Sequence, residues 1–176
     1  MDLHTGEELW FRNNTRLAFG QILDFKGFNM HGSLAYLWET SGNTWNAYDA
    51  FTGEWVFTFN DVPSGSQIYG PNGEILRFNV NTRNGWMTMW NSTKAVLDSS
   101  PIFISPAFTQ GTYAPEGQTI NATLGIQWNV SIPTGLSGSV RKVFYGDKII
   151  GSTAGTGIGS AMGENPVALW GISLEP

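Results

Sequence analysis

The sequence predicts an all-β fold of short antiparallel strands, and three observations support this prediction: the composition, the spacing of apolar residues and an internal repeat. The chain of 176 residues contains 22 glycines and 8 prolines, and 14% of its residues are aromatic. Its apolar runs are short and are interrupted by Gly, Asn, Ser and Pro, which is typical of strands joined by turns. No stretch has helical periodicity of useful length, so no helix is predicted.

The repeat is a short motif that occurs four times. Asp2-Leu-His-Thr-Gly-Glu-Glu-Leu-Trp10 returns as Asp49-Ala-Phe-Thr-Gly-Glu-Trp-Val-Phe57, and weaker copies lie at Asn79–Trp90 and Asn121–Trp128. In each copy a strand ends at Asp or Asn, a glycine that tolerates positive φ makes the turn, and a second strand follows. The motif glycines are 47, 32 and 40 residues apart, and they are Gly6, Gly53, Gly85 and Gly125.

A strand repeat of about 40–45 residues is typical of β-propeller blades. We therefore expect a single β-propeller domain, or a fragment of one, over residues 1–176, with about four blades of four antiparallel strands. Either the ring closes at four blades, or the segment is part of a larger ring or of one completed by a partner. The predicted strands are Leu34–Thr40, Thr44–Asp49, Glu54–Phe59, Glu74–Val80, Trp86–Asn91, Ile126–Ser131, Val140–Tyr145, Lys148–Ser152 and Val167–Leu174.

Four further segments are expected to connect these strands. Turn residues predict hairpins at Tyr69–Glu74 and Tyr145–Lys148. The prolines of residues 99–123 predict an insertion that crosses an edge or face of the ring. Residues 151–166, rich in glycine and small residues, predict a long hairpin loop.

The motif resembles the blade motif of the quinoprotein (PQQ-repeat) propellers, which is Ala-x-Asp-x-x-x-Thr-Gly-x-x-x-Trp in loose form. The second copy matches at Ala47, Asp49, Thr52 and Gly53, with Phe57 in place of the family's Trp; the first copy matches at Asp2, Thr5, Gly6 and Trp10. The third and fourth copies keep Gly85 and Gly125 with a displaced Trp90 and Trp128. In that family the Trp of one blade docks against the turn of its neighbour. The resemblance therefore implies that Trp10, Trp90 and Trp128 pack between blades.

The sequence predicts no catalytic, cofactor or metal site. Dehydrogenases of the resembling family hold their quinone with a calcium bound by Glu, Asn and Asp, and many carry a vicinal disulfide, but the chain has no cysteine and no stretch carries that triad. His4 and His31 are isolated, whereas zinc needs three or four ligands. The carboxylates form no recognisable pair. Residues 155–163 mimic a dinucleotide-binding loop but lack the following helix, so a hairpin tip is predicted there.

Charge and sequons indicate where the protein works. A net charge of −5 with nine basic residues argues against nucleic acid and anionic lipid as partners. No apolar run approaches the about 20 residues of a membrane span, and no secretory signal is recognisable. Four N-glycosylation sequons favour an extracytoplasmic location, and their asparagines are Asn13, Asn91, Asn121 and Asn129.

These features predict a non-catalytic extracytoplasmic propeller for cell-surface assembly, adhesion or self-association, with protein partners or its own copies bound through strand edges. Trp38, Trp45 and Trp55 are expected to be exposed. The segments Asp2–Trp10 and Val167–Leu174 are expected to complete one blade head to tail, within a ring or between copies. Two alternatives remain: part of a PQQ-dependent or other funnel-site oxidoreductase, and a propeller that binds glycans through surface Trp and Asn.

Overall fold

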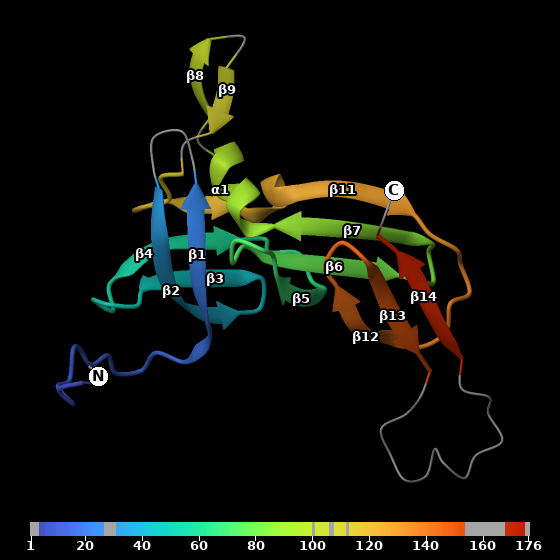
Figure 1. Cartoon of the computed structure of the whole chain (residues 1–176), viewed down its shortest axis with the longest axis horizontal. Helices are drawn as coiled ribbons and strands as arrows, with labels where there is room; N and C mark the ends of the chain where they lie inside the picture. Colours follow the sequence, from blue (N-terminus) through green and yellow to red (C-terminus); the bar gives the residue numbers. More distant parts are fainter. Residues whose placement is uncertain are drawn as a thin grey trace.

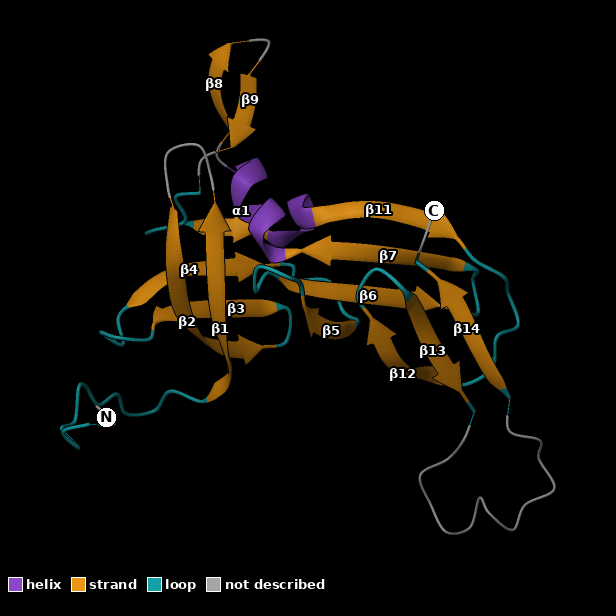
Figure 2. Ribbon diagram, viewed as in Figure 1, coloured by secondary structure: helices purple, strands orange, loops and turns teal. Residues whose placement is uncertain are grey.

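The protein is mostly β with one short helix, as its computed structural model shows (Figures 1 and 2). Residues 4–26, 31–99, 101–105, 108–111, 113–153 and 168–174 are described. Their strands form three larger sheets and one hairpin, and within these ranges the strands do not close into a ring.

The first sheet is an antiparallel meander with an added edge strand. It contains β1 (Leu17–Lys26), β2 (His31–Ser41), β3 (Thr44–Asp49) and β4 (Trp55–Asn60), and β10 (Thr119–Asn121) pairs in parallel with β4. The free edge of β1 is fixed to the next sheet, because the Asp24 N–H donates to the Asn72 carbonyl at 2.8 Å and the Tyr69 hydroxyl donates to the Gly20 carbonyl at 2.6 Å.

The second sheet is also a four-stranded antiparallel meander, with a long connection before its last strand. Its strands are β5 (Ser66–Tyr69), β6 (Ile75–Asn81), β7 (Trp86–Asn91) and β11 (Ile126–Ser131). The connection from β7 to β11 contains α1 (Ser92–Ser99), the hairpin of β8 (Pro101–Ser105) and β9 (Phe108–Gly111), then β10 and the 3₁₀ helix η1 (Ala122–Gly125). The insertion predicted at 99–123 lies within this connection, and its β10 reaches the edge of the first sheet.

The third sheet has three strands, β12 (Ser139–Phe144), β13 (Lys148–Ser152) and β14 (Leu169–Ser173). The long loop predicted at 151–166 lies mostly outside the described residues, since β13 continues to Ser152 and residues 154–167 are not described.

The sheets stack face to face in chain order. Successive side chains of a strand point to opposite faces, and on β6 Ile75 faces the first sheet whereas Leu76 and Phe78 face the third. The first core, between the first and second sheets, includes Trp90, whose ring lies 6.1 Å from that of Trp45. The second core, between the second and third sheets, is formed around Leu76, Phe78, Met87, Val143, Ile149 and Trp170. The second sheet is therefore buried on both faces, while the first and third sheets each have an outer face that no other described sheet covers.

The structure corrects three expectations. Trp38 and Trp45, expected to be exposed, are only 1% and 3% exposed, because they alternate with polar residues and face the first core; Trp55 is 42% exposed, as expected. Strand β1 was not predicted, because apolar Ile22 lies on its outer face, 71% exposed, beside buried Leu23 and obscures the alternation. The helix α1 was not predicted either, since its eight residues are too few for a periodic signal.

Candidate functional site

The turn of the second motif copy explains why the motif needs its Asp and Gly. The Asp49 carboxylate accepts the backbone N–H groups of Phe51 and Thr52, each at 2.8 Å, and the Gly53 N–H donates to the Asp49 carbonyl at 2.8 Å. Gly53 has φ +71°, a conformation that side chains with a Cβ disfavour. Ala47 is fully buried beside this turn, and Phe57, at the family's Trp position, lies in the first core.

Trp10 of the first copy docks on this turn. A Cβ at Gly53 would lie 2.5 Å from the indole ring of Trp10, so the ring covers the glycine face directly. The Trp10 indole N–H donates to the Ala50 carbonyl at 3.1 Å. Arg12 donates to the Gly53 carbonyl at 2.7 Å and lies 4.5 Å from the centre of the Tyr48 ring. Trp10 of the first copy therefore lies on the turn of the second copy, although the segment that carries it belongs to no described sheet.

Two other copies repeat the turn geometry without a docked indole. In the third copy, Gly85 has φ +70° and its N–H donates to the Asn81 carbonyl at 2.9 Å, but the methyl group of Thr134 covers it. In the first copy, Gly6 has φ +74° with open space beside it, and Thr5 accepts the Glu7 N–H at 3.3 Å. Asp2 lies outside the described residues.

The fourth copy is not a turn of this type, which corrects the prediction. Gly125 ends η1 without a positive φ, because the Asn121 side chain caps a 3₁₀ helix there instead of closing a hairpin. Trp90 still packs between sheets, fully buried, with its indole N–H donating to the Ala122 carbonyl. Trp128 is half-buried and contacts Phe78 at 6.0 Å between ring centroids, beside the second core.

No protein-family model, curated protein or solved structure matches this chain. The likeness to the PQQ-repeat propellers thus rests on the motif residues alone.

A further tryptophan of the same kind was missed from the sequence. Trp170 on β14 donates its indole N–H to the Ser137 carbonyl at 2.8 Å, and its ring occupies the space beside Gly151. Gly151 of β13 is the sequence feature that goes with this tryptophan, because it lies opposite Trp170 and any Cβ at Gly151 would collide with the indole ring.

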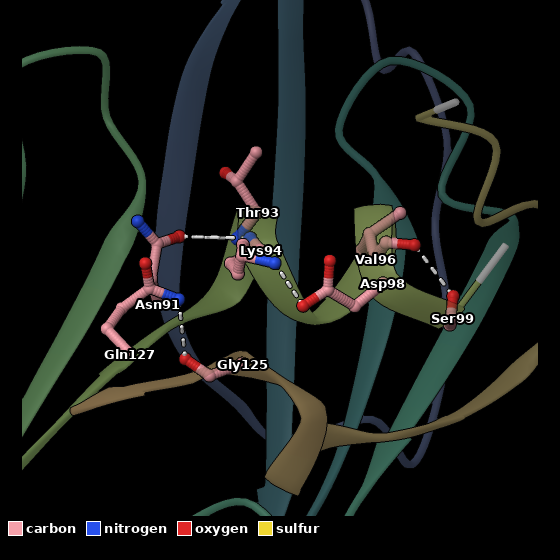
Figure 3. Close-up of polar contacts among 8 residues, drawn as sticks. All are labelled: Asn91, Thr93, Lys94, Val96, Asp98, Ser99, Gly125 and Gln127. Carbon is pink, nitrogen blue, oxygen red and sulfur yellow. Dashed lines mark hydrogen bonds and ion pairs between the residues drawn. The ribbon is translucent and has the colours of Figure 1, made fainter. Parts of the chain in front are cut away.

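A cavity of about 300 Å³, with both polar and apolar side chains in its wall, lies where β1, the β5–β6 turn and the start of α1 meet. Asn91 caps α1, since its side-chain oxygen accepts the N–H groups of Thr93 at 2.8 Å and Lys94 at 3.2 Å (Figure 3). The Thr93 hydroxyl oxygen is buried and has no hydrogen-bond partner. Glu74 is 9% exposed and accepts the Asn72 N–H at 2.9 Å. The cavity is lined by Leu23, Asp24, Phe25, Lys26, Asn72, Glu74, Asn91 and Thr93.

The outer face of the first sheet carries a hydrogen-bonded network centred on Glu39. Its carboxylate accepts the Tyr48 hydroxyl at 2.9 Å and the Asn46 amide at 3.2 Å. These hydrogen bonds, that of Tyr48 first, lower the pKa of Glu39. Thr58 extends the network, because it donates to Asn46 at 2.8 Å and accepts the Trp55 indole N–H at 3.0 Å. The face is thus polar around Glu39 and apolar at Ile22.

The four sequons differ in their surroundings. Asn13 and Asn129 are exposed, the latter on the edge strand β11. Asn91 is half-buried as the cap of α1. Asn121 is exposed, but its side-chain oxygen accepts both the N–H and the hydroxyl of Thr123.

The remaining site residues considered from the sequence do not assemble. Among the described residues, no three His, Asp or Glu side chains lie close enough to hold a metal ion. The glycine-rich segment at 155–163 lies outside the described residues. The helices in the described part of the chain are too short or too polar to cross a bilayer.

Proposed function

We propose that the chain is a propeller-type module of the extracytoplasmic surface that assembles with its own copies or related sheets and is not itself catalytic. The sequence predicted about four blades, whereas the described residues form three stacked sheets that do not close into a ring. In this proposal the three sheets are part of a larger assembly. The four sequons and low charge support the extracytoplasmic location.

The observation that carries this proposal is the pair of outer faces, at the two ends of the stack, that no other described sheet covers. Large apolar side chains lie on both: Ile22, 71% exposed, on the first sheet, and Leu169, 73% exposed, with Phe144, 42% exposed, on the third. Each internal face of the stack is packed against the next sheet. Apolar side chains that gather on an open face indicate an interaction surface.

Sedimentation velocity over a wide concentration range tests the proposal. We expect the chain to associate reversibly, and we expect Ile22→Lys and Leu169→Lys to weaken that association. Leu124→Lys is the matched control, since Leu124 is 44% exposed on η1, away from both faces. A chain that stays monomeric at every concentration, with all three variants alike, would show that these faces do not assemble.

The cavity beside α1 favours glycan binding as a second candidate function. Its carboxylates and amides are the groups that hydrogen-bond to sugar hydroxyls, Thr93 lies in its wall, and its volume of about 300 Å³ accommodates a monosaccharide unit. Nuclear magnetic resonance titration with a panel of monosaccharides tests it. Shifts should be confined to signals near Asn72 and Thr93 and should be weakened by Thr93→Val; no shift with any sugar would exclude this function.

A further inference from the structure

We infer that residues 7–12 of one copy add to the outer edge of β14 in a second copy and become the fourth strand of its third sheet. This inference rests on the proposed self-association and names the segments that carry it. Residues 7–12 are called the arm below.

The first argument is that, among the described residues, the first motif copy is not followed by a strand of a sheet and the third sheet has one strand fewer than the second. The second, third and fourth copies are followed by β4, β7 and β11, which all belong to sheets. The first copy is followed by the arm, which belongs to none. The third sheet has three strands, whereas the other two have at least four. In the part of the chain that the structure describes, no strand pairs with the outer edge of β14, and the edge of a sheet can accept an added strand.

The second argument is the alternation of side chains along the arm. Trp10 and Arg12 contact the Asp49–Gly53 turn of their own first sheet. Leu9, which precedes Trp10, is 53% exposed, and Phe11, between Trp10 and Arg12, is 77% exposed. This is the period-2 pattern of a strand with one face bound and the other open. In β14, Trp170 and Ile172 face the second core, so an arm paired with β14 places Leu9 and Phe11 where that core continues.

The third argument is that the strand must come from another copy. Within one chain, the arm lies on the first sheet and β14 in the third, with the second sheet packed between them (Figure 1). Charge also favours the head-to-tail contact: residues 4–61 contain seven acidic and three basic residues, while residues 139–153 contain three basic and one acidic. Opposite charge of this kind orients partners. Two copies joined at both ends would bring six of these larger sheets together, within the four to eight blades of propellers.

Engineered cysteines test the pairing cleanly, because the chain has none of its own. The variant Phe11→Cys is mixed with Ile172→Cys or with Leu174→Cys under mild oxidation. A disulfide needs Cα atoms within about 7 Å of each other. The Phe11→Cys chain should therefore form a mixed dimer at least about tenfold faster with Ile172→Cys or Leu174→Cys than with the control Val130→Cys. Val130 is 42% exposed and lies on the edge strand β11. Only intermolecular bonds can form, since each variant carries a single cysteine.

The outcomes separate this inference from the proposed function. Faster cross-linking at 172 or 174 supports the arm–β14 strand. Reversible self-association with cross-linking no faster than at Val130 refutes the arm as the fourth strand and leaves self-association standing. A chain that remains monomeric and does not cross-link refutes both. Circular dichroism on each variant confirms that the fold is retained; Phe11 is exposed, so its replacement removes no buried contact.

Discussion

Replacing Gly53 by alanine tests whether the Trp10 contact contributes to stability. The left-handed backbone at φ +71° costs an alanine about 1 kcal/mol. The new Cβ would also lie 2.5 Å from the Trp10 ring, a distance that no real contact tolerates, so the indole must leave. Its hydrogen bond to Ala50, at 3.1 Å, contributes about 1 kcal/mol more. We therefore expect Gly53→Ala to lower the free energy of unfolding by about 2 kcal/mol.

Gly42→Ala is the matched control for the backbone alone. Gly42 has φ +61° in the β2–β3 hairpin, and nothing lies within 4 Å of the Cβ that an alanine would add. Its replacement should cost only about 1 kcal/mol. Urea unfolding followed by far-ultraviolet circular dichroism gives both free energies, provided that the slope against urea stays constant.

A double-mutant cycle with Trp10→Ala isolates the contact itself. Without the indole, Gly53→Ala should cost only its backbone strain, so the coupling energy between the two positions should be at least about 1 kcal/mol. Additive effects, with Gly53→Ala equally costly whether or not Trp10 is present, would refute the reasoning that the motif turn is a receptor for the tryptophan.

Three further predictions concern titration and modification. Hydrogen bonds hold the pKa of Glu39 below its ordinary value, so the ionised Glu39 stabilises the fold above the ordinary pKa, and this stabilisation is lost as pH falls through the lowered pKa. Tyr48→Phe should raise the pKa of Glu39 in a carboxyl titration followed by nuclear magnetic resonance. An unchanged pKa would contradict the network. Burial raises the pKa of Tyr36 to about 12, so the folded state keeps a proton that the unfolded state loses near pH 10, and the free energy of unfolding should fall between pH 10 and pH 12. Tyr36→Phe should reduce this fall in stability. A variant that loses as much stability as the wild type over this range would contradict the prediction. In a glycosylating host, mass spectrometry should find glycan on Asn129 and little on Asn121, whose side chain is held by Thr123; equal occupancy would show that capping does not protect the sequon.

The sequence predicted the parts of the fold that repeat or alternate. Strands β3, β7, β11 and β13 have the predicted bounds, because each is a short run rich in apolar residues with residues typical of turns beside its ends. The Asp49–Gly53 turn was predicted from residue chemistry that acts over five positions.

The sequence failed where long-range packing overrides local pattern. Strand β1 turns Phe19, Leu23 and Phe25 toward the first core, but polar Gln21 is buried on that same face and apolar Ile22 is exposed on the other. Its alternation is therefore hidden in the sequence. The Asn121–Gly125 copy looks like a turn in sequence, but Gly125 lies against Trp90 and Ala95, and this close packing fits a 3₁₀ helix. The cavity could not be predicted, since its walls come from three separate segments.

The motif residues form a turn of the first sheet and hold the segment around Trp10 against it, and for this reason the motif says little about what the protein binds. Its Asp and Gly shape a turn, and its Trp reaches a turn in another copy about 40 residues away. Residues under these constraints are not available for a ligand. Residues that bind a ligand are expected where the motif is broken, because a departure from the residues that the fold requires is typical of functional sites. The third and fourth copies depart most from the motif, and between them the chain inserts α1, with Asn91 and Thr93 in the cavity wall. Binding should therefore be sought first beside α1 and assembly at the outer faces, whereas the intact Asp49–Gly53 turn holds Trp10.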